Sequence, residues 1–203
     1  MGEYQKQRKV KLFCAILYSD YEIYKKTLNI LENEFSKIDY ISDVILFSYT
    51  SYYQPEMGDN IYRLFISFSD PIYPYKLAEI KKRTNEIENL FKIDNKRKIN
   101  IDPGYISLSN LVLATTKNYS HRIALSAEIY GEVTLIYKKG GFQSLDWTYP
   151  DYKDSKNIVH FNNIRNILSK QLKESKNNWI KIIYFDYLYL YILIISLLLF
   201  LPD

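Results

Sequence analysis

The chain has 203 residues, which is enough for one large domain and too few for two well-packed enzymatic domains. Hydrophobic residues make up 47% and charged residues 25%, so a core can form, and a disordered or collagen-like chain is excluded. One cysteine and two histidines exclude an intramolecular disulfide and a metal site built from several such residues, so we expect no zinc, haem or iron–sulfur centre. A net charge of +4 does not by itself indicate a nucleic-acid partner.

The first predicted elements are a strand and a helix. Residues 10–18 are apolar on both faces from Leu12 onward, which predicts a central strand. This run is too short for the hydrophobic region of a signal peptide, so we expect a cytoplasmic protein. Residues 19–22 fit a capping box with Ser19 as the cap. Behind the box, apolar residues recur every three or four positions, which predicts a helix as far as Lys37.

The next four elements complete a recognisable order. Apolar or alternating residues predict strands over residues 40–49, 63–69 and 98–102, and a helix over residues 77–91 follows Pro74. Together with the first strand and helix, this is the order of a ferredoxin-like βαββαβ sheet, whose first and third strands are central. The most apolar predicted strands occupy those central places.

The rest of the domain is predicted to extend that core. We expect a short helix over residues 107–116, strands over residues 122–126 and 131–137, and a hairpin turn into a strand at 142–145. A loop at 147–152 then leads to a last helix. The sequence therefore predicts an α+β fold in which a ferredoxin-like core is extended by a C-terminal β-hairpin and a last helix.

We expect a single domain over residues 1–176, followed by a hydrophobic tail over residues 177–203. Within the tail, residues 182–201 are apolar or tyrosine with two exceptions, and such a stretch is long enough to span a bilayer. Lysines precede it, so an anchor would leave the main body on the cytoplasmic face of the membrane. A buried helix is the weakest interpretation, because a helix that is apolar all round needs a larger protein around it. The remaining interpretation is a spurious extension from an AT-rich gene, and the residues alone favour it and the anchor equally.

The chain lacks the common nucleotide-binding and hydrolase motifs. Gly-x-x-x-x-Gly-Lys-Ser/Thr, Gly-x-Gly-x-x-Gly, His-Glu-x-x-His and Gly-x-Ser-x-Gly are all absent, which excludes the P-loop, Rossmann, zincin and serine-hydrolase signatures. Residues 116–119 resemble a guanine-reading loop, but the acidic residue two places after Lys117 is missing. An ordinary GTPase is therefore excluded.

Three blocks of polar residues interrupt the apolar pattern: residues 52–58, 100–105 and 115–122. The third block brings Lys117, His121 and Arg122 together beside hydroxyl side chains. An arginine fork holds phosphate or carboxylate through two bonds, and a histidine titrates near neutrality. We therefore predict that Lys117 and Arg122 bind an anion and that His121 transfers a proton. The alternative is a surface loop whose arginine pairs with a nearby carboxylate.

Three carboxylates are candidates to face this loop: Asp102, Glu132 and Asp151. Their oxygens fit a Mg²⁺ ion or a general base, and we expect Asp102 or Glu132 to orient His121 or a metal. The alternatives are a turn residue for Asp102 and Asp151, and a solvent-facing strand position for Glu132. Glu56 is a further candidate in the first polar block, where it could instead cap a turn.

Aromatic side chains near these blocks are candidates to stack on a ligand ring: Tyr105, Trp147, Tyr149 and Tyr152. Covering the open end of a sheet needs the same rings, so both interpretations remain. Cys14, inside the first strand, is predicted to be a small core residue. His160, on the last helix, is predicted to be exposed and without a role.

Residues 100–105, 113–122 and 147–152, with residues 53–58 before them, resemble the corresponding blocks of an uncharacterised prokaryotic family, a domain of unknown function. The resemblance covers residues 10–171. The hydrophobic tail departs from the family pattern, so the resemblance slightly favours a lineage-specific extension over an anchor. It implies no established activity, cofactor or partner. It does support the candidate site, because the polar blocks selected for their chemistry are also the blocks that resemble the family. A shared site is therefore favoured over separate structural accidents.

These observations give one leading hypothesis and two alternatives from other classes. The leading hypothesis is a cytosolic protein that binds a small anionic ligand, a nucleotide or another phosphate, between the turn after residue 102 and the loop at 117–122. The first alternative is an RNA-binding module, favoured by the ferredoxin-like sheet and the basic loop at 92–98. Residues 63–69 lack the aromatic-glycine string of RNA-recognition strands, which argues against it. The second alternative is a scaffold whose aromatic loop binds a partner helix.

Overall fold

The structure is a computed structural model that describes residues 2–5 and 7–199, with side chains described as far as Asn177. The chain divides into two compact units, residues 1–166 and 167–203. The named strands all belong to the first unit, and helix α5 (Ser155–Leu199) contributes to both. The expected membrane span at 182–201 lies outside the residues whose side chains are described. Among the fully described residues, no helix is long and apolar enough to cross a membrane.

Strand β1 (Lys11–Tyr18) lies inside a large antiparallel sheet, with a strand on each side. It pairs with β4 (Tyr62–Phe68) on one side and with β5 (Ile99–Ile106) on the other. β2 (Ile38–Ile41) pairs with the far edge of β4, so this part of the sheet has the order β2-β4-β1-β5. Every residue of β1 is buried, as predicted for a strand covered on both faces.

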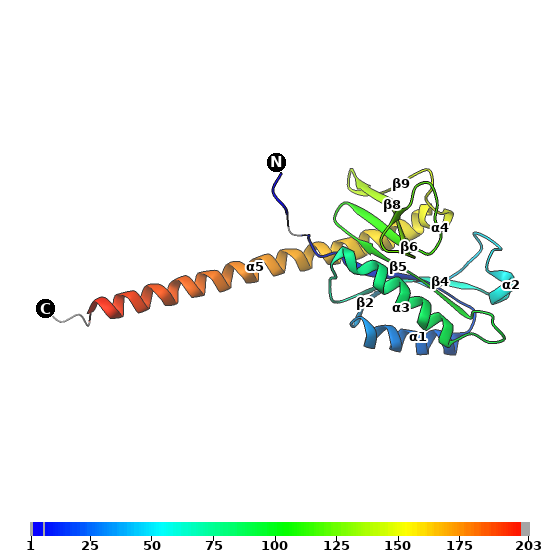
Figure 1. The fold of residues 1–203 in the computed structure, drawn as a ribbon, viewed down its shortest axis with the longest axis horizontal. Helices are drawn as coiled ribbons and strands as arrows, with labels where there is room; N and C mark the ends of the chain where they lie inside the picture. The colour runs from blue at the N-terminus through cyan, green and yellow to red at the C-terminus, as the bar shows by residue number, and fades with distance from the viewer. Residues whose placement is uncertain (1, 6, 200–203) are drawn as a thin grey trace. The chain divides into compact units, whose positions relative to one another are not determined.

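Helices α1 (Tyr21–Glu34) and α3 (Leu77–Leu90) cover one face of these strands (Figure 1). In α1, Tyr24, Leu28 and Leu31 recur at spacings of four and three, so they form one stripe that packs on the sheet. A 3₁₀ turn that begins at Pro74 precedes α3. The core on this face includes Leu12, Cys14, Ile16, Leu31, Leu64, Ile66, Ile80 and Ile87.

The start of α1 differs from the predicted capping box. Asp20 is the N-cap, and its Oδ1 accepts a hydrogen bond from the Ile23 amide at 2.9 Å. The Ser19 amide donates to the Lys98 carbonyl oxygen at 3.1 Å, so it is not available to the Glu22 side chain. The cap therefore lies one residue later than the sequence pattern indicates.

The first turns of α5 cover the opposite face of the sheet. The ring of Phe161 lies 4.8 Å from that of Phe65 and 6.0 Å from that of Phe13, between ring centroids. Because side chains alternate along a strand, Phe13 and Phe65 point away from α1 and α3. His160 is half-buried here with its Nδ1 2.8 Å from Tyr40 Oη, so the expectation of an exposed, idle histidine is wrong. This second core includes Phe13, Ala15, Phe65, Leu111, Leu113, Leu135, Phe142, Phe161 and Ile164.

Further strands extend the sheet beyond β5. β6 (Asn110–Thr115) pairs with β5 and with β8 (Tyr130–Lys138). β8 also pairs with β7 (Ile123–Ala124) and β9 (Gly141–Ser144), while β3 (Ile45–Leu46) pairs with β4. The described residues therefore form one nine-stranded sheet with helices packed on it, and the predicted α+β class is confirmed.

The helix predicted over residues 107–116 is wrong, because most of this segment is β6. Leu111 and Leu113 belong to the core under α5, whereas Val112 and Ala114 pack with residues of α3. The side chains therefore alternate between two cores. A short apolar run of this kind does not show which period it follows, so strand and helix cannot be separated from the sequence alone.

The strand predicted over residues 40–49 is divided into β2 and β3. Ser42 separates them, and its hydroxyl accepts a hydrogen bond from the Phe65 amide at 2.8 Å. Two segments predicted as loops each contain one helical turn, α2 (Gln54–Met57) and α4 (Pro150–Lys153). In both, a proline stands in the first turn, where its missing amide hydrogen costs nothing.

Candidate functional site

The candidate site begins where β5 and β6 separate. These strands pair only where Gly104, Tyr105 and Ile106 face Leu113, Val112 and Leu111. At Gly104 the closest approach excludes any side chain, since an added Cβ would lie 2.5 Å from the Val112 carbonyl oxygen and 2.6 Å from Phe13 Cε1. Before Gly104 comes Pro103, which has no amide hydrogen. Residues 99–102 therefore have β1 on one side and no strand on the other.

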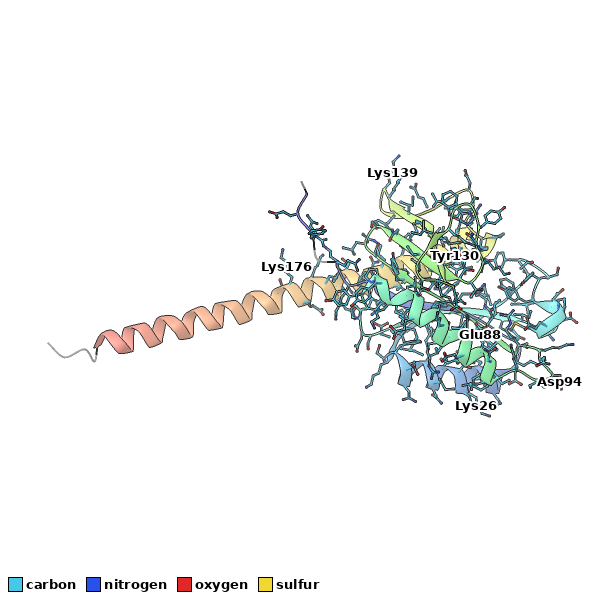
Figure 2. The ribbon with its side chains drawn as sticks, in the orientation of Figure 1. Lys26, Glu88, Asp94, Tyr130, Lys139 and Lys176 are labelled. Atoms are coloured by element: carbon cyan, nitrogen blue, oxygen red, sulfur yellow. The ribbon has the colours of Figure 1, made fainter. Side chains whose placement is uncertain are left out.

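Two side chains of α3 take the place of the missing strand. The Ile101 amide donates to Glu88 Oε1 at 2.7 Å, and Lys81 Nζ donates to the Ile101 carbonyl oxygen at 3.1 Å. Figure 2 labels Glu88 on α3. Burial raises the pKa of Glu88 to about 6, although Lys81 and the Ile101 amide act in the opposite direction. The unpaired edge of β5 is thus satisfied by buried polar side chains.

A cavity of about 710 Å³ opens at this gap. Its lining comes from α3, β4, β5, β6, β8 and α4 and from the loop around α2. The charged lining residues are Arg63, Lys81, Glu88, Arg97, Asp102, Lys117, Glu132 and Asp151. The tyrosines in the lining are Tyr49, Tyr52, Tyr53, Tyr149 and Tyr152. Cationic and acidic side chains are balanced, and tyrosine rings share the lining with them, which suits a small polar molecule with a ring.

Arg63 is the most deeply buried cation of this lining, with 3% of its surface exposed. Its Nη2 donates to Asp151 Oδ2 at 2.7 Å, and its guanidinium carbon lies 5.1 Å from the Phe47 ring centroid. Its Nε and Nη1 have no hydrogen-bond partner in the structure. The buried hydroxyl of Tyr152 also lacks a partner. Buried polar groups are nearly always hydrogen-bonded, so these donors in one cavity wall are unusual.

Asp102 lies at one end of a chain of polar contacts that begins on β5. Its Oδ2 accepts from Asn100 Nδ2 at 2.7 Å, and its Oδ1 accepts from Lys81 Nζ at 3.3 Å. Asn100 Oδ1 in turn accepts from Arg97 Nη1 at 2.8 Å. Arg97 also donates from Nε and Nη2 to the two oxygens of Glu56, each at 2.8 Å, and this arrangement lowers the pKa of Glu56. Glu56 is therefore an anchor for Arg97 and does not line the cavity.

Glu132 connects the cavity to the loop that contains His121 and Arg122. Its side chain is 1% exposed, and its Oε2 lies 2.7 Å from Arg122 Nε and 3.1 Å from His121 Nε2. Arg122 Nη1 donates to the Lys117 carbonyl oxygen at 2.8 Å, and Nη2 donates to Tyr149 Oη at 2.6 Å. All three nitrogens of Arg122 are thus hydrogen-bonded within the protein. This matches the alternative interpretation of the loop, in which the arginine pairs with a carboxylate.

His121 lies on the outer side of Glu132, in a second and more open pocket of about 660 Å³. Its ring stacks on that of Trp147, with centroids 5.1 Å apart and an interplanar angle of 10°. Trp147 Nε1 donates to the Val133 carbonyl oxygen at 2.8 Å, which fixes the indole on β8. His121 and Trp147 therefore form an outer layer that contacts the cavity through Glu132.

The structure brings some of the predicted site residues together and separates others. The predicted residues that line the cavity are Asp102, Lys117, Glu132, Tyr149, Asp151 and Tyr152. Those outside its lining are Glu56, Tyr105, His121, Arg122 and Trp147. Tyr105, for example, packs beside Val112 in the cluster under α3. The roles assigned to these residues stay predictions.

Sequence reasoning missed two cations at the centre of the site, Arg63 and Lys81. Each stands among apolar neighbours of a buried element: Arg63 is two residues before Phe65, and Lys81 follows Ile80. A charged residue on the buried face of a strand or helix is rare unless it is paired. That irregularity was the available signal.

No group of three or more His, Cys, Asp and Glu side chains that could hold a metal ion occurs in the described part of the chain. The cavity carboxylates pair with protein cations: Asp102 with Lys81, Asp151 with Arg63, and Glu132 with Arg122. A Mg²⁺ ion in this cavity would have to compete with these pairs.

The fold and the cavity define an α+β protein with a polar, aromatic-walled pocket at a gap in its sheet. The model of the family described as domain of unknown function DUF4416 matches residues 8–168. The chain belongs to this family, which confirms the membership expected from the polar blocks. No curated protein matches the chain, and no solved structure matches it.

Proposed function

We propose that the protein binds a small anionic ligand in the cavity between β5 and β6. The observation that carries this proposal is the set of unpartnered groups on residues of the cavity wall, Nε and Nη1 of Arg63 and the hydroxyl of Tyr152. A buried donor without a partner costs about 1–3 kcal/mol. An anion offers strong acceptors to an arginine fork, so its binding would recover this cost.

This proposal moves the anion contact away from Arg122. The nitrogens of Arg122 already donate to Glu132, Lys117 and Tyr149. Arg63 and Lys117 are better placed, because both line the cavity. Among the described residues, Lys117 Nζ has one hydrogen-bond partner, the Tyr52 hydroxyl at 3.0 Å. The tyrosine rings would hold the uncharged part of the ligand.

We also infer that β2, β4, β1 and β5, with α1 and α3, correspond to a ferredoxin-like core. The strand order, the antiparallel pairing and the placement of both helices on one face support this assignment. β6 and β8 would then be an extension at the β5 edge. The cavity would lie at the junction of the core and its extension.

A thermal-shift screen tests the binding proposal. Nucleotides, sugar phosphates and inorganic phosphate are added to the full chain at about 100 times the expected Kd, where binding stabilises the fold by ~2.7 kcal/mol. For a domain of this size, that corresponds to a rise in melting temperature of roughly 5–10 °C. We expect at least one phosphorylated compound to give such a rise.

Three variants assign the effect to the cavity. Lys117→Ala removes one proposed contact, and Arg63→Lys keeps the buried charge but loses the fork. Lys82→Ala is the matched control, because Lys82 is exposed on α3, pairs with Glu128 and does not line the cavity. We expect the shift to shrink in the first two variants and to persist in the control. A screen without any shift, or equal shifts in all three variants, contradicts the proposal.

A further inference from the structure

We propose that the ligand of this cavity carries hydroxyl groups beside its anionic group and that Asp102 binds those hydroxyls, so that the ligand class is a phosphorylated sugar. The inference rests on the proposed function, because it concerns the same cavity. It adds a second recognition element, an acceptor, to the donors of Arg63 and Lys117.

The Asp102 carboxylate has acceptor capacity that the protein does not use. An ionised carboxylate can accept about four hydrogen bonds. Protein donors supply one at 2.7 Å from Asn100 and a longer one at 3.3 Å from Lys81. The side chain is 29% exposed and lines the cavity. The remaining lone pairs of Asp102 are therefore available to a molecule in the cavity.

The carboxylate is also held in a fixed orientation. Arg97 Nη1 donates to Asn100 Oδ1, which leaves the Asn100 amide hydrogens to face Asp102. Arg97 is itself fixed by its two contacts with Glu56. Sites whose supporting side chains are locked in this way select for hydrogen-bond geometry. Only a donor group on the ligand satisfies an ionised carboxylate, and hydroxyl and ammonium groups are the two common choices.

Lys81 favours the hydroxyl over the ammonium. Its Nζ lies 3.3 Å from Asp102 Oδ1 and already balances the negative charge. A ligand ammonium bound to the same carboxylate would be repelled by this fixed cation, whereas a neutral hydroxyl would not.

The donors Arg63 and Lys117 and the acceptor Asp102 line the same cavity. Burial raises the pKa of Asp151, Arg63 opposes this shift, and the charge of Asp102 adds to it. Asp102 therefore lies within electrostatic range of the Arg63–Asp151 pair. Tyr149 and Tyr152 line the same space and offer apolar ring faces. An anionic group, adjacent hydroxyls and a ring face together describe a sugar phosphate, either alone or as the ribose phosphate of a nucleotide.

The main test compares AMP with an analogue that lacks only the two ribose hydroxyls. Calorimetric titration of the full chain measures the Kd for AMP, for 2′,3′-dideoxy-AMP, for ribose 5-phosphate and for inorganic phosphate. We expect AMP to bind about 10- to 100-fold more tightly than its dideoxy analogue, since hydrogen bonds to a charged group are worth this much. Comparing the Kd of ribose 5-phosphate with that of AMP shows whether the ligand is a free sugar phosphate or a nucleotide.

A second pair of ligands tests the choice of hydroxyl over ammonium. 3-Phosphoglycerate and O-phosphoserine carry a hydroxyl and an ammonium on the same skeleton, and we expect 3-phosphoglycerate to bind more tightly.

A variant then assigns the discrimination to Asp102. In Asp102→Asn, we expect the affinity for AMP to fall by the same 10- to 100-fold while the affinity for dideoxy-AMP stays constant. Glu86→Gln is the matched control, because Glu86 is an exposed carboxylate on α3 that pairs with Arg83 outside the cavity. It should leave both affinities unchanged. The comparison of ligands on the unaltered chain needs no variant, so it holds even if Asp102→Asn folds poorly.

The outcomes separate this inference from the proposed function. If phosphate or dideoxy-AMP binds as tightly as AMP, the ligand is an anion without hydroxyl recognition, and only the present inference is overturned. Tighter binding of O-phosphoserine likewise overturns it. If no anion binds at all, the proposed function is overturned together with the inference.

Discussion

At the scale of single residues, Tyr152 provides a direct test of the cavity wall. Its hydroxyl is buried without a partner, and burial raises its pKa well above the ordinary value. In Tyr152→Phe we expect the free energy of unfolding to stay constant or to rise by up to about 1 kcal/mol, because an unpaired polar group is removed. Urea denaturation of the ligand-free protein measures it.

Tyr149→Phe is the matched control for Tyr152→Phe. The Tyr149 hydroxyl accepts a hydrogen bond from Arg122 Nη2 at 2.6 Å, so its removal should cost about 0.5–1.5 kcal/mol. A large loss of stability in Tyr152→Phe would mean that its hydroxyl has a partner in solution. In that case the principal observation behind the proposed function would fail.

Glu88 gives the fold a defined pH dependence. Burial raises its pKa from 4.5 to about 6, so the folded state holds a proton more tightly than the unfolded state does. This contribution to stability is complete below pH 4.5 and is lost as the pH rises through 6. A shift of this size corresponds to about 2 kcal/mol. The test compares the unfolding free energies of Glu88→Gln and of the unaltered protein at pH 4 and at pH 7. The value of the variant minus that of the unaltered protein should rise by about this amount, because only the unaltered protein loses the contribution of Glu88. A constant difference would contradict the assignment.

The sequence indicated which residues belong to the site better than it indicated which side chains they contact. Asp102 and Lys117 come from two of the polar blocks, Glu132 from a predicted strand and Asp151 from the loop at 147–152, and all four line one cavity. The sequence could not show that Arg122 is held by Glu132, because that pairing depends on how β8 lies against the loop before β7.

At the scale of elements, the N-terminus of α1 yields a paired prediction. Asp20 caps the helix through its Oδ1, and Ser19 does not. We expect Asp20→Ala to lower the free energy of unfolding by about 1 kcal/mol and Ser19→Ala to change it by less than about 0.5 kcal/mol. Chemical denaturation distinguishes the two. The reverse ranking would restore the capping box that the sequence pattern indicates.

The contact between β5 and β6 yields a second prediction. Gly104→Ala would place a methyl group 2.5 Å from the Val112 carbonyl oxygen, and the backbone would have to shift. Overpacking of this kind costs about 1–3 kcal/mol. Gly141→Ala on β9 is the control, because no atom lies within 4 Å of its added Cβ. Melting temperatures compare them, and equal stability of the two variants would mean that β5 and β6 are further apart.

Elements with strong periodicity were predictable, and short apolar runs were not. α1 and α3 carry complete apolar stripes, so their existence follows from sequence alone. β6 does not, because its apolar residues face two cores and the run is too short to reveal a period. The division of residues 40–49 into β2 and β3 depends on Ser42 bonding to Phe65 of β4, which is a tertiary contact.

At the scale of the whole molecule, the clusters that hold the sheet and its helices lie between Leu12 and Ile164. We therefore expect a chain that ends at Lys176 to keep its melting temperature within about 2 °C and to bind ligand with unchanged affinity. Circular dichroism and calorimetry measure both.

Membrane fractionation of the two chains decides the role of the tail, since equal solubility excludes an anchor.

The overall architecture was predictable in its class and in the central position of its first strand. The extension by β6, β8, β7 and β9 was predictable only in part, because the short apolar run of β6 does not distinguish a strand from a helix. A ligand site between the turn after residue 102 and the loop at 117–122 was expected from the sequence, but the gap in the sheet that forms the cavity was not. It depends on the point at which two strands diverge, which single-sequence patterns do not specify.

The side chains of Lys81 and Glu88 have one more consequence. An unpaired strand edge can form hydrogen bonds with a strand of another molecule, which is a first step toward aggregation. Here the amide and carbonyl of Ile101 are already occupied. The protein can therefore keep a solvent-accessible opening in the middle of its sheet without offering a template for self-association. Removing both side chains would leave the amide and carbonyl of Ile101 free to pair with a strand of another molecule.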